Sequence, residues 1–201
     1  MNEPIAAVIV GILLSLSAGV RMTLPLLGVN LLAFYHEITL PDNMAWLGTQ
    51  PTLIILSVAC AVETLVHFVP AAGTWIKAMA TPLAFVAGTL LMAVPLGDKN
   101  PLYQWTLAAV VGGGTATLTH LGVTGLRAVT APANVASLGI FGVLWNIAEF
   151  LVSILLAALS GVCVLAGWIV GAVILFVVAV LVLLAVIKGL DFWTRKRPVT
   201  P

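Results

Sequence analysis

Long apolar stretches, separated by short polar ones, run along most of the chain. A bilayer is crossed by about 20 consecutive apolar residues in a helix, so six of these stretches are long enough to span it. The pattern therefore predicts an all-α, polytopic membrane helix bundle of about six spans. The predicted spans cover residues 5–34, 52–70, 81–97, 104–126, 138–159 and 164–188.

The composition supports a membrane protein and excludes a soluble domain. Of the 201 residues, 62% are hydrophobic and 7% are charged, far from the usage of soluble proteins. We expect residues 1–201 to form a single transmembrane domain in a lipid bilayer. The net charge is +1 and no large cluster of Lys and Arg is present, so we expect no nucleic-acid partner. We expect no metal or other cofactor either, because Cys60 and Cys163 lie in apolar stretches typical of core thiols.

The charges between the spans predict an orientation. The loop over residues 35–51 is acidic, whereas the loop that holds Lys77 and the tail after Lys188 are basic. Basic loops tend to face the cytoplasm. No Lys or Arg precedes the first apolar stretch, which is also too long for a cleaved leader, so we interpret it as the first span. The sequence therefore predicts a multi-pass membrane protein with both termini in the cytoplasm.

Two halves of the chain carry similar motifs in the same order. A Gly-Val-Arg sequence ending at Arg21 and followed by Pro25 is echoed by Gly-Leu-Arg ending at Arg127 and followed by Pro132. Three spans per half would make the second copy cross the membrane in the opposite sense, as inverted repeats of transporters do. We predict two inverted three-helix repeats, with chance recurrence of small apolar residues as the alternative. The predicted repeats cover residues 1–100 and 101–190.

Four ionisable side chains lie inside or against the apolar stretches: Arg21, Glu63, Arg127 and Glu149. A charge at the centre of a membrane helix costs roughly 2.5 to 3.5 kcal/mol on insertion scales, so it is normally paired or functional. These four are our first candidates for substrate or ion binding. Hydropathy alone places Arg127 at the cytoplasmic end of its span, where it would be a topology anchor, whereas the repeat places it inside the membrane.

Each arginine is followed by a proline that predicts a helix break. Pro25 cannot donate a hydrogen bond to the carbonyl of Arg21, and Pro132 interrupts the long segment that holds Arg127. Backbone freed at membrane depth is tolerated only where it is buried in protein or lines a cavity, which is where a solute could bind. The alternative is that Arg21 snorkels or forms a structural ion pair. Hydroxyls that could serve the freed backbone or a ligand belong to Ser15, Ser17 and Thr23.

Two histidines lie at helical spacing from the charged residues. His67 follows Glu63 by four residues, which puts imidazole and carboxylate on one helix face and predicts a proton relay. His120 precedes Arg127 by seven residues and shares its face. For each histidine taken singly, ordinary packing is the competing interpretation.

The fifth predicted span carries further polar groups beside its acidic residue. Asn146 and Ser153 flank Glu149 at helical spacing. Such groups can also hydrogen-bond one another between helices, at about 0.6 to 2 kcal/mol per contact. We favour a functional site, because charges in both halves with titratable neighbours exceed what packing requires.

Glycines mark places of close helix packing. Residues 112–114 are three consecutive glycines, but without a Lys or a preceding strand they are no phosphate loop. Inside a span they let another backbone approach or let the helix unwind. Gly167 and Gly171 form a small-xxx-small face on the last predicted span, which predicts either a homo-oligomer or packing within the chain.

Three of these motifs together resemble a known family. They are the Gly-x-Arg-x-x-x-Pro element over residues 19–25, the Glu-to-Pro element over residues 63–70, and the stretch over residues 112–127. Over residues 11–160 the chain is similar to a bacterial membrane family catalogued as domain of unknown function four-one-two-six. The resemblance implies a small multi-spanning bacterial membrane protein, hence one of the bacterial cytoplasmic (inner) membrane, and names no reaction. At a position where the family often carries an acidic residue, this chain has His67.

Two classes of function follow from the sequence. The first is a transporter or channel for a small anion or a phosphate-bearing lipid, in which the arginines attract the anion and Glu63, Glu149 and His67 take up protons. The alternative is a membrane scaffold or assembly factor whose buried charges are structural ion pairs. An enzyme is not expected, since no HExxH, GxSxG or paired-acid metal motif is present.

Overall fold

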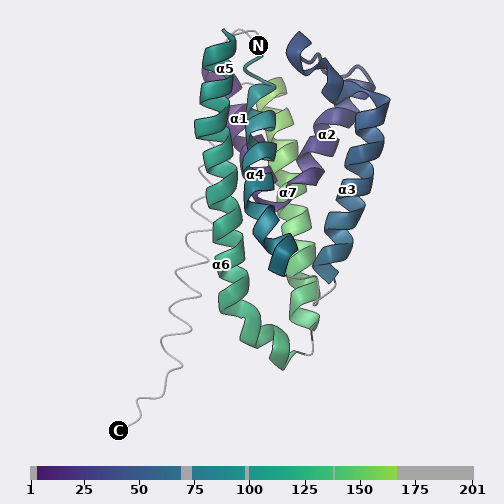
Figure 1. The fold of residues 1–201 in the computed structure, drawn as a ribbon, viewed down its shortest axis with the longest axis vertical. Helices are drawn as coiled ribbons and strands as arrows, with labels where there is room; N and C mark the ends of the chain where they lie inside the picture. Colours follow the sequence, from purple (N-terminus) through teal and green to yellow (C-terminus); the bar gives the residue numbers. More distant parts are fainter. Residues whose placement is uncertain (1–3, 69–73, 98–99, 138, 167–201) are drawn as a thin grey trace.

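The computed structural model describes residues 4–68, 74–97, 100–137 and 139–166. Every element within these ranges is a helix, which confirms the predicted all-α class for this part of the chain. The helices pack as a bundle of mostly upright rods (Figure 1). In chain order they are α1 (Pro4–Val20), α2 (Thr23–Phe34), the 3-10 helix η1 (Asp42–Gly48), α3 (Gln50–Phe68), α4 (Thr74–Ala93), α5 (Pro101–Leu107), the π-helix η2 (Ala108–Gly113), α6 (Gly114–Ala136) and α7 (Ile140–Ala166).

Fewer candidate spans are found than the six predicted. Two described helices are long and apolar enough to cross a membrane, Pro101–Pro132 and Ile140–Gly161. The bent pair Asp42–Gly48 and Gln50–Val66, whose two parts meet at 59°, would make a third. The apolar helices are compatible with membrane insertion. The predicted last span, with Gly167 and Gly171, lies outside the described residues.

The first predicted span, residues 5–34, does not cross the bundle. It forms two helices joined at Arg21 and Met22, and Figure 1 shows that α1 runs into the bundle and α2 returns to the same end. Their 17 and 12 residues give lengths of about 26 Å and about 18 Å, less than the thickness of a bilayer core. The start of α1 and the loop before η1 therefore lie at one end. The prediction that a span separates the N-terminus from the loop 35–51 is wrong, because hydropathy does not register a reversal of direction.

The break between α1 and α2 falls where Pro25 predicts it. The N–H of Arg21 still donates to the carbonyl of Ser17 at 3.0 Å and completes α1. Continuation of the helix would need an N–H from Pro25 for the carbonyl of Arg21, and proline has none. As the third residue of α2, Pro25 sits where a helical N–H has no partner within the helix, so the new helix starts without penalty.

The second predicted break, at Pro132, is wrong. α6 continues through this proline to Ala136, and Arg127 lies within the uninterrupted helix. The lower end of α6 bends in Figure 1. A proline inside a helix can be absorbed as a bend when packing holds the rest of the helix in place.

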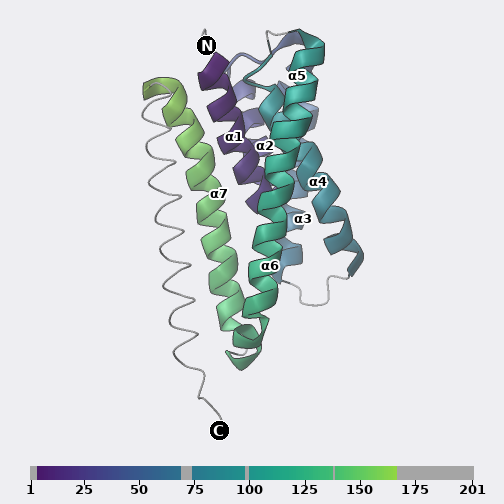
Figure 2. The same ribbon diagram turned by 90° about the vertical axis from the view of Figure 1, so that its left-hand side faces the viewer.

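The structure does not show the predicted inverted repeat. Corresponding helices of an inverted pair run in opposite directions. Here α1, which leads to Arg21, and α6, which leads to Arg127, run in the same direction (Figures 1 and 2). The two arginine segments also differ in form, since one ends at a break and the other continues.

α1 is the central helix of the bundle. It lies between α7 and α6 in Figure 2 and also packs on α4. Leu13 of α1 is fully buried. Leu91 and Met92 of α4 are also fully buried and belong to the same hydrophobic core. This central place puts the end of α1, and hence Arg21, inside the bundle.

The upper end of the α1–α2 hairpin is fastened by Asn30. This side chain is fully buried on α2. Its Nδ2 donates to the carbonyl of Leu47 and to that of Thr49, the latter at 3.4 Å. These bonds hold α2 against η1 and the start of α3.

Consecutive glycines let α4 and the π-helix η2 approach closely, as the sequence predicted. A Cβ placed on Gly88 would lie 2.4 Å from the Cβ of Ala116 and 2.5 Å from the carbonyl oxygen of Gly112. A Cβ placed on Gly112 would lie 2.6 Å from the carbonyl oxygen of Gly88. The contact is backbone against backbone, so neither side can yield by a rotamer change.

We expect Gly88→Ala to lower the free energy of unfolding by about 1 to 3 kcal/mol, because the added methyl group overpacks this crossing. Thermal unfolding of the purified protein in detergent measures it. Gly122→Ala on α6 is the matched control, since a Cβ there meets nothing within 4 Å. Equal melting temperatures for the two variants would contradict the close approach.

Candidate functional site

A carboxylate from α3 caps the N-terminus of α2. Glu63 accepts hydrogen bonds from the backbone N–H groups of Met22 and Thr23, both at 3.1 Å, and from the hydroxyl of Thr23. The N-cap residue Met22 supplies no side-chain cap. These N–H groups have no acceptor within the helix, and together with the positive end of the helix dipole they stabilise the negative charge of Glu63.

The guanidinium of Arg21 is buried beside this cap, and the residue is 3% exposed. Its Nη1 donates to Thr64 Oγ1 at 3.4 Å and its Nη2 to the carbonyl oxygen of Asn146 at 3.3 Å. Its Cζ lies 5.5 Å from the centre of the Phe150 ring. Both hydrogen bonds are long and reach neutral oxygens, and Nε is buried without an acceptor among the described residues. Arg21 therefore keeps unused hydrogen-bonding capacity inside the bundle.

The second arginine forms a two-pronged ion pair between α6 and α7. Arg127 Nε donates to Glu149 Oε1 at 2.7 Å, and Nη2 donates to Oε2 of the same carboxylate. Trp145, one turn before Glu149, also donates its indole N–H to Oε1. Glu149 is 5% exposed and the Arg127 side chain 33%. Two parallel hydrogen bonds are the arrangement in which a guanidinium and a carboxylate fit best.

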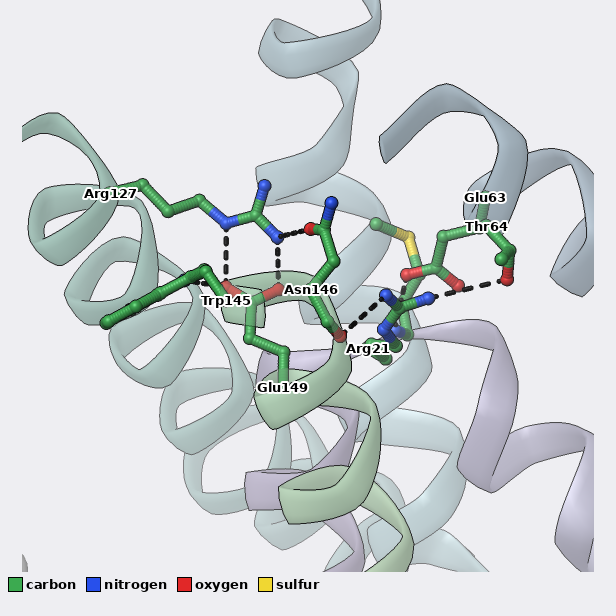
Figure 3. Close-up of polar contacts among 8 residues, drawn as sticks. Arg21, Glu63, Thr64, Arg127, Trp145, Asn146 and Glu149 are labelled. Atoms are coloured by element: carbon green, nitrogen blue, oxygen red, sulfur yellow. Dashed lines mark hydrogen bonds and ion pairs between the residues drawn. The ribbon is translucent and has the colours of Figure 1, made fainter. Parts of the chain in front are cut away.

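Asn146 joins the two arginines. Its side-chain oxygen accepts from Arg127 Nη2 at 3.0 Å, and its backbone oxygen accepts from Arg21 Nη2 at 3.3 Å. Figure 3 shows the resulting row, from Arg127 and Glu149 through Asn146 to Arg21 and on to Thr64 and Glu63. Four helix segments that are far apart in the sequence thus supply one polar cluster inside an apolar bundle.

The two predicted histidines have different outcomes. The backbone of His67 lies one turn after Glu63 on α3, but its side chain lies outside the described part of the chain. His120 is half buried on α6, two turns before Arg127. The proposed proton relay through His67 stays a prediction.

The predicted serines have a structural use. Ser17 on α1 and Ser153 on α7 are fully buried, and each hydroxyl donates to the backbone oxygen of the other, at 2.8 and 3.3 Å. Ser15 donates to the carbonyls of Gly11 and Gly88. These bonds tie α1 to α7 and α4 directly above the polar cluster.

Three members of the cluster's surroundings escaped prediction from the sequence: Thr64, Trp145 and Phe150. Trp145 precedes Glu149 by four residues, so its helical spacing was a usable signal. Thr64 and Phe150 carry no such signal, because their contacts with Arg21 depend on how α3 and α7 pack on the hairpin.

Other candidate sites are few in the described ranges. Within them, no three His, Cys, Asp or Glu side chains come together as metal ligands. A shallow cavity of about 290 Å³ is lined by residues of η1, of α5 and of the loops that precede them. Asn43 donates to Gln104 at 2.9 Å in its wall.

Comparison with known proteins gives a family but no relative with an activity. A family model described as "Domain of unknown function (DUF4126)" matches residues 8–187. The match confirms the resemblance seen in the sequence motifs and extends it towards both ends. No curated protein and no solved structure matches the chain.

Proposed function

The chain belongs to the DUF4126 family, and we propose that it is a membrane transporter or channel for a small anion or a phosphate-bearing lipid, coupled to protons. One observation carries the proposal: Asn146 brings the guanidinium groups of Arg21 and Arg127 together inside an apolar bundle. In a structural ion pair each arginine donates to a carboxylate, whereas the hydrogen bonds of Arg21 reach a hydroxyl and a backbone carbonyl. Arg21 keeps a buried Nε without an acceptor in the described structure, which suits a group that awaits an anion.

The charge balance of the cluster supports proton coupling. Two arginines and two glutamates, Arg21, Arg127, Glu63 and Glu149, sum to zero when all are ionised. An anion entering alone would leave one uncompensated negative charge among apolar helices, which is unfavourable. An anion entering with one proton on a glutamate keeps the cluster neutral. His67 on α3 and His120 on α6 carry imidazoles on the same helices, so they are candidates to pass that proton on.

The arrangement of the ends supports an orientation in a bacterial inner membrane. The acidic loop and the start of α1 share one end, and α4, which holds Lys77, begins at the other. We place the acidic end outside and the Lys77 end in the cytoplasm, following the distribution of basic residues. The N-terminus then lies outside. A last span over residues 164–188 would return the basic tail to the cytoplasm.

Flux measurements in proteoliposomes test the function. We expect uptake of a small anion to be driven by an inward proton gradient and to disappear in Glu63→Gln, because the variant cannot exchange a proton at this site. Formate and inorganic phosphate, each with a pH-sensitive dye inside the vesicle, are the anion probes. Transbilayer movement of a labelled phospholipid tests the lipid alternative.

Glu37→Gln is the matched control, since Glu37 is exposed in the loop after α2. Its flux should equal that of the wild type. Unchanged proton-driven flux in Glu63→Gln would remove the coupling role of Glu63. Folded wild-type protein that moves none of the three probes would argue against transport.

The alternative function is a scaffold or assembly factor, and the Arg127–Glu149 pair favours it. In this pair both oxygens of the Glu149 carboxylate accept hydrogen bonds from Arg127, and Trp145 adds a third, so the pair joins α6 to α7 as a structural clamp would. On this alternative, removal of Arg21 should destabilise the protein, and simultaneous neutralisation of Glu63 should restore it.

A further inference from the structure

We propose that the hairpin tip, Arg21, Met22 and Thr23, is a binding seat for a carboxylate, and that Glu63 is an internal competitor that occupies the seat until a carboxylate substrate replaces it. The inference rests on the proposed function and names its substrate class. It assigns Glu63 a second role, beyond taking up a proton.

The seat is already occupied by a carboxylate of the protein itself. One oxygen of Glu63 accepts from Met22 N–H at 3.1 Å, and the other accepts from Thr23 N–H at 3.1 Å and from the Thr23 hydroxyl. Each oxygen of a planar two-oxygen anion thus has its own backbone donor. The donors are the N-cap residue and the first residue of a helix of 12 residues, whose dipole favours a negative charge there.

Arg21 supplies the second, independent sign of a ligand. It is 3% exposed, directly precedes the two backbone donors, and its Nε is buried with no acceptor in the described structure. Its Nη1 bond to Thr64, the residue next to Glu63, is 3.4 Å long. A cation held this loosely next to an occupied anion seat is poised to contact a second carboxylate as Glu63 leaves.

The cap is long-range, which makes exchange feasible. Glu63 reaches the tip from a helix 40 residues away in sequence, so it can withdraw with a rotamer change on α3 while α2 stays folded. The incoming carboxylate would take over the same hydrogen bonds.

Binding of formate to Glu63→Ala tests the seat. The variant is purified at full length in nanodiscs, and formate is titrated at neutral pH by calorimetry. Because the wild-type seat is filled by Glu63, we expect formate to bind Glu63→Ala about tenfold or more tightly than the wild type. Adding Thr23→Val, which removes the hydroxyl donor but keeps the side-chain shape, should weaken that binding. Glu37→Ala, at an exposed glutamate, should behave as the wild type.

Several results would overturn the inference. Equal formate affinity in the wild type and Glu63→Ala would mean that Glu63 does not compete. Equal binding of chloride and formate would remove the carboxylate class. If Glu63→Ala does not fold, recovery of folded protein on adding formate during purification supports the seat, and no recovery refutes it. If formate does not bind, the carboxylate seat is refuted, but transport of phosphate or lipid is still testable. If formate binds but none of the probes is transported, the seat is supported and the transport function is refuted.

Discussion

Glu149→Leu is expected to lower the free energy of unfolding by about 3 kcal/mol, the lower end of the range for a broken buried ion pair. The substitution leaves the guanidinium of Arg127 without its carboxylate and Trp145 without an acceptor. We take the lower end because 33% of the Arg127 side chain is exposed, and exposed charge is screened. Chemical unfolding in detergent, followed by circular dichroism, measures the change.

A double-mutant cycle separates the ion pair from the loss of shape. Arg127→Met together with Glu149→Leu removes both charges, so we expect the double variant to regain most of the lost stability. Glu37→Leu, at an exposed glutamate, is the control and should change little. A double variant as unstable as Glu149→Leu would show that the pair contributes through packing rather than charge.

Arg21→Met is expected to abolish anion flux while the protein stays folded. The arginine is buried and its described hydrogen bonds are long and reach neutral groups. Replacing such a charge with an apolar side chain of similar length removes the desolvation penalty and keeps the contact with Phe150. The Glu63 carboxylate keeps its three donors on Met22 and Thr23. The loss of the cation removes the attraction for an incoming anion. Flux in proteoliposomes and the melting temperature of the same preparation are the two measurements.

Arg21→Lys tests whether charge alone is sufficient. The ammonium keeps the charge but loses the planar fork that reaches Thr64 and Asn146 together, so we expect reduced but measurable flux. The scaffold alternative predicts a different pattern. It requires Arg21→Met to unfold, with recovery in the double variant that also carries Glu63→Gln.

Some of the candidate site was predictable because helical spacing is local. Glu149 and Asn146 are three residues apart on one helix, so their common face follows from the sequence alone. The break at Arg21 was equally local, since it depends on the missing N–H of Pro25 four residues later. Pro132 shows the limit of this rule. The same missing N–H was absorbed within α6 as part of a long, packed helix.

Partner choice among the charges was not predictable. The sequence allowed either arginine to pair with either glutamate, and only the packing of α6 on α7 brings Arg127 to Glu149. Glu63 instead meets the backbone of Met22 and Thr23. The break at Pro25 leaves backbone N–H groups at the start of α2 without partners in the helix. Such groups attract a carboxylate, as a cation does.

The sequence by itself determined that this chain is helical and compatible with a membrane, and which few polar side chains had to be accounted for. Composition and apolar runs are sufficient for that, because the transfer energy of a residue depends mainly on its own chemistry. The tertiary structure alone decided that residues 5–34 turn back inside the bundle and that Asn146 joins the two arginines. The direction in which a chain runs, and which distant side chains meet, depend on how the helices pack. The pattern of hydropathy along the sequence contains neither kind of information.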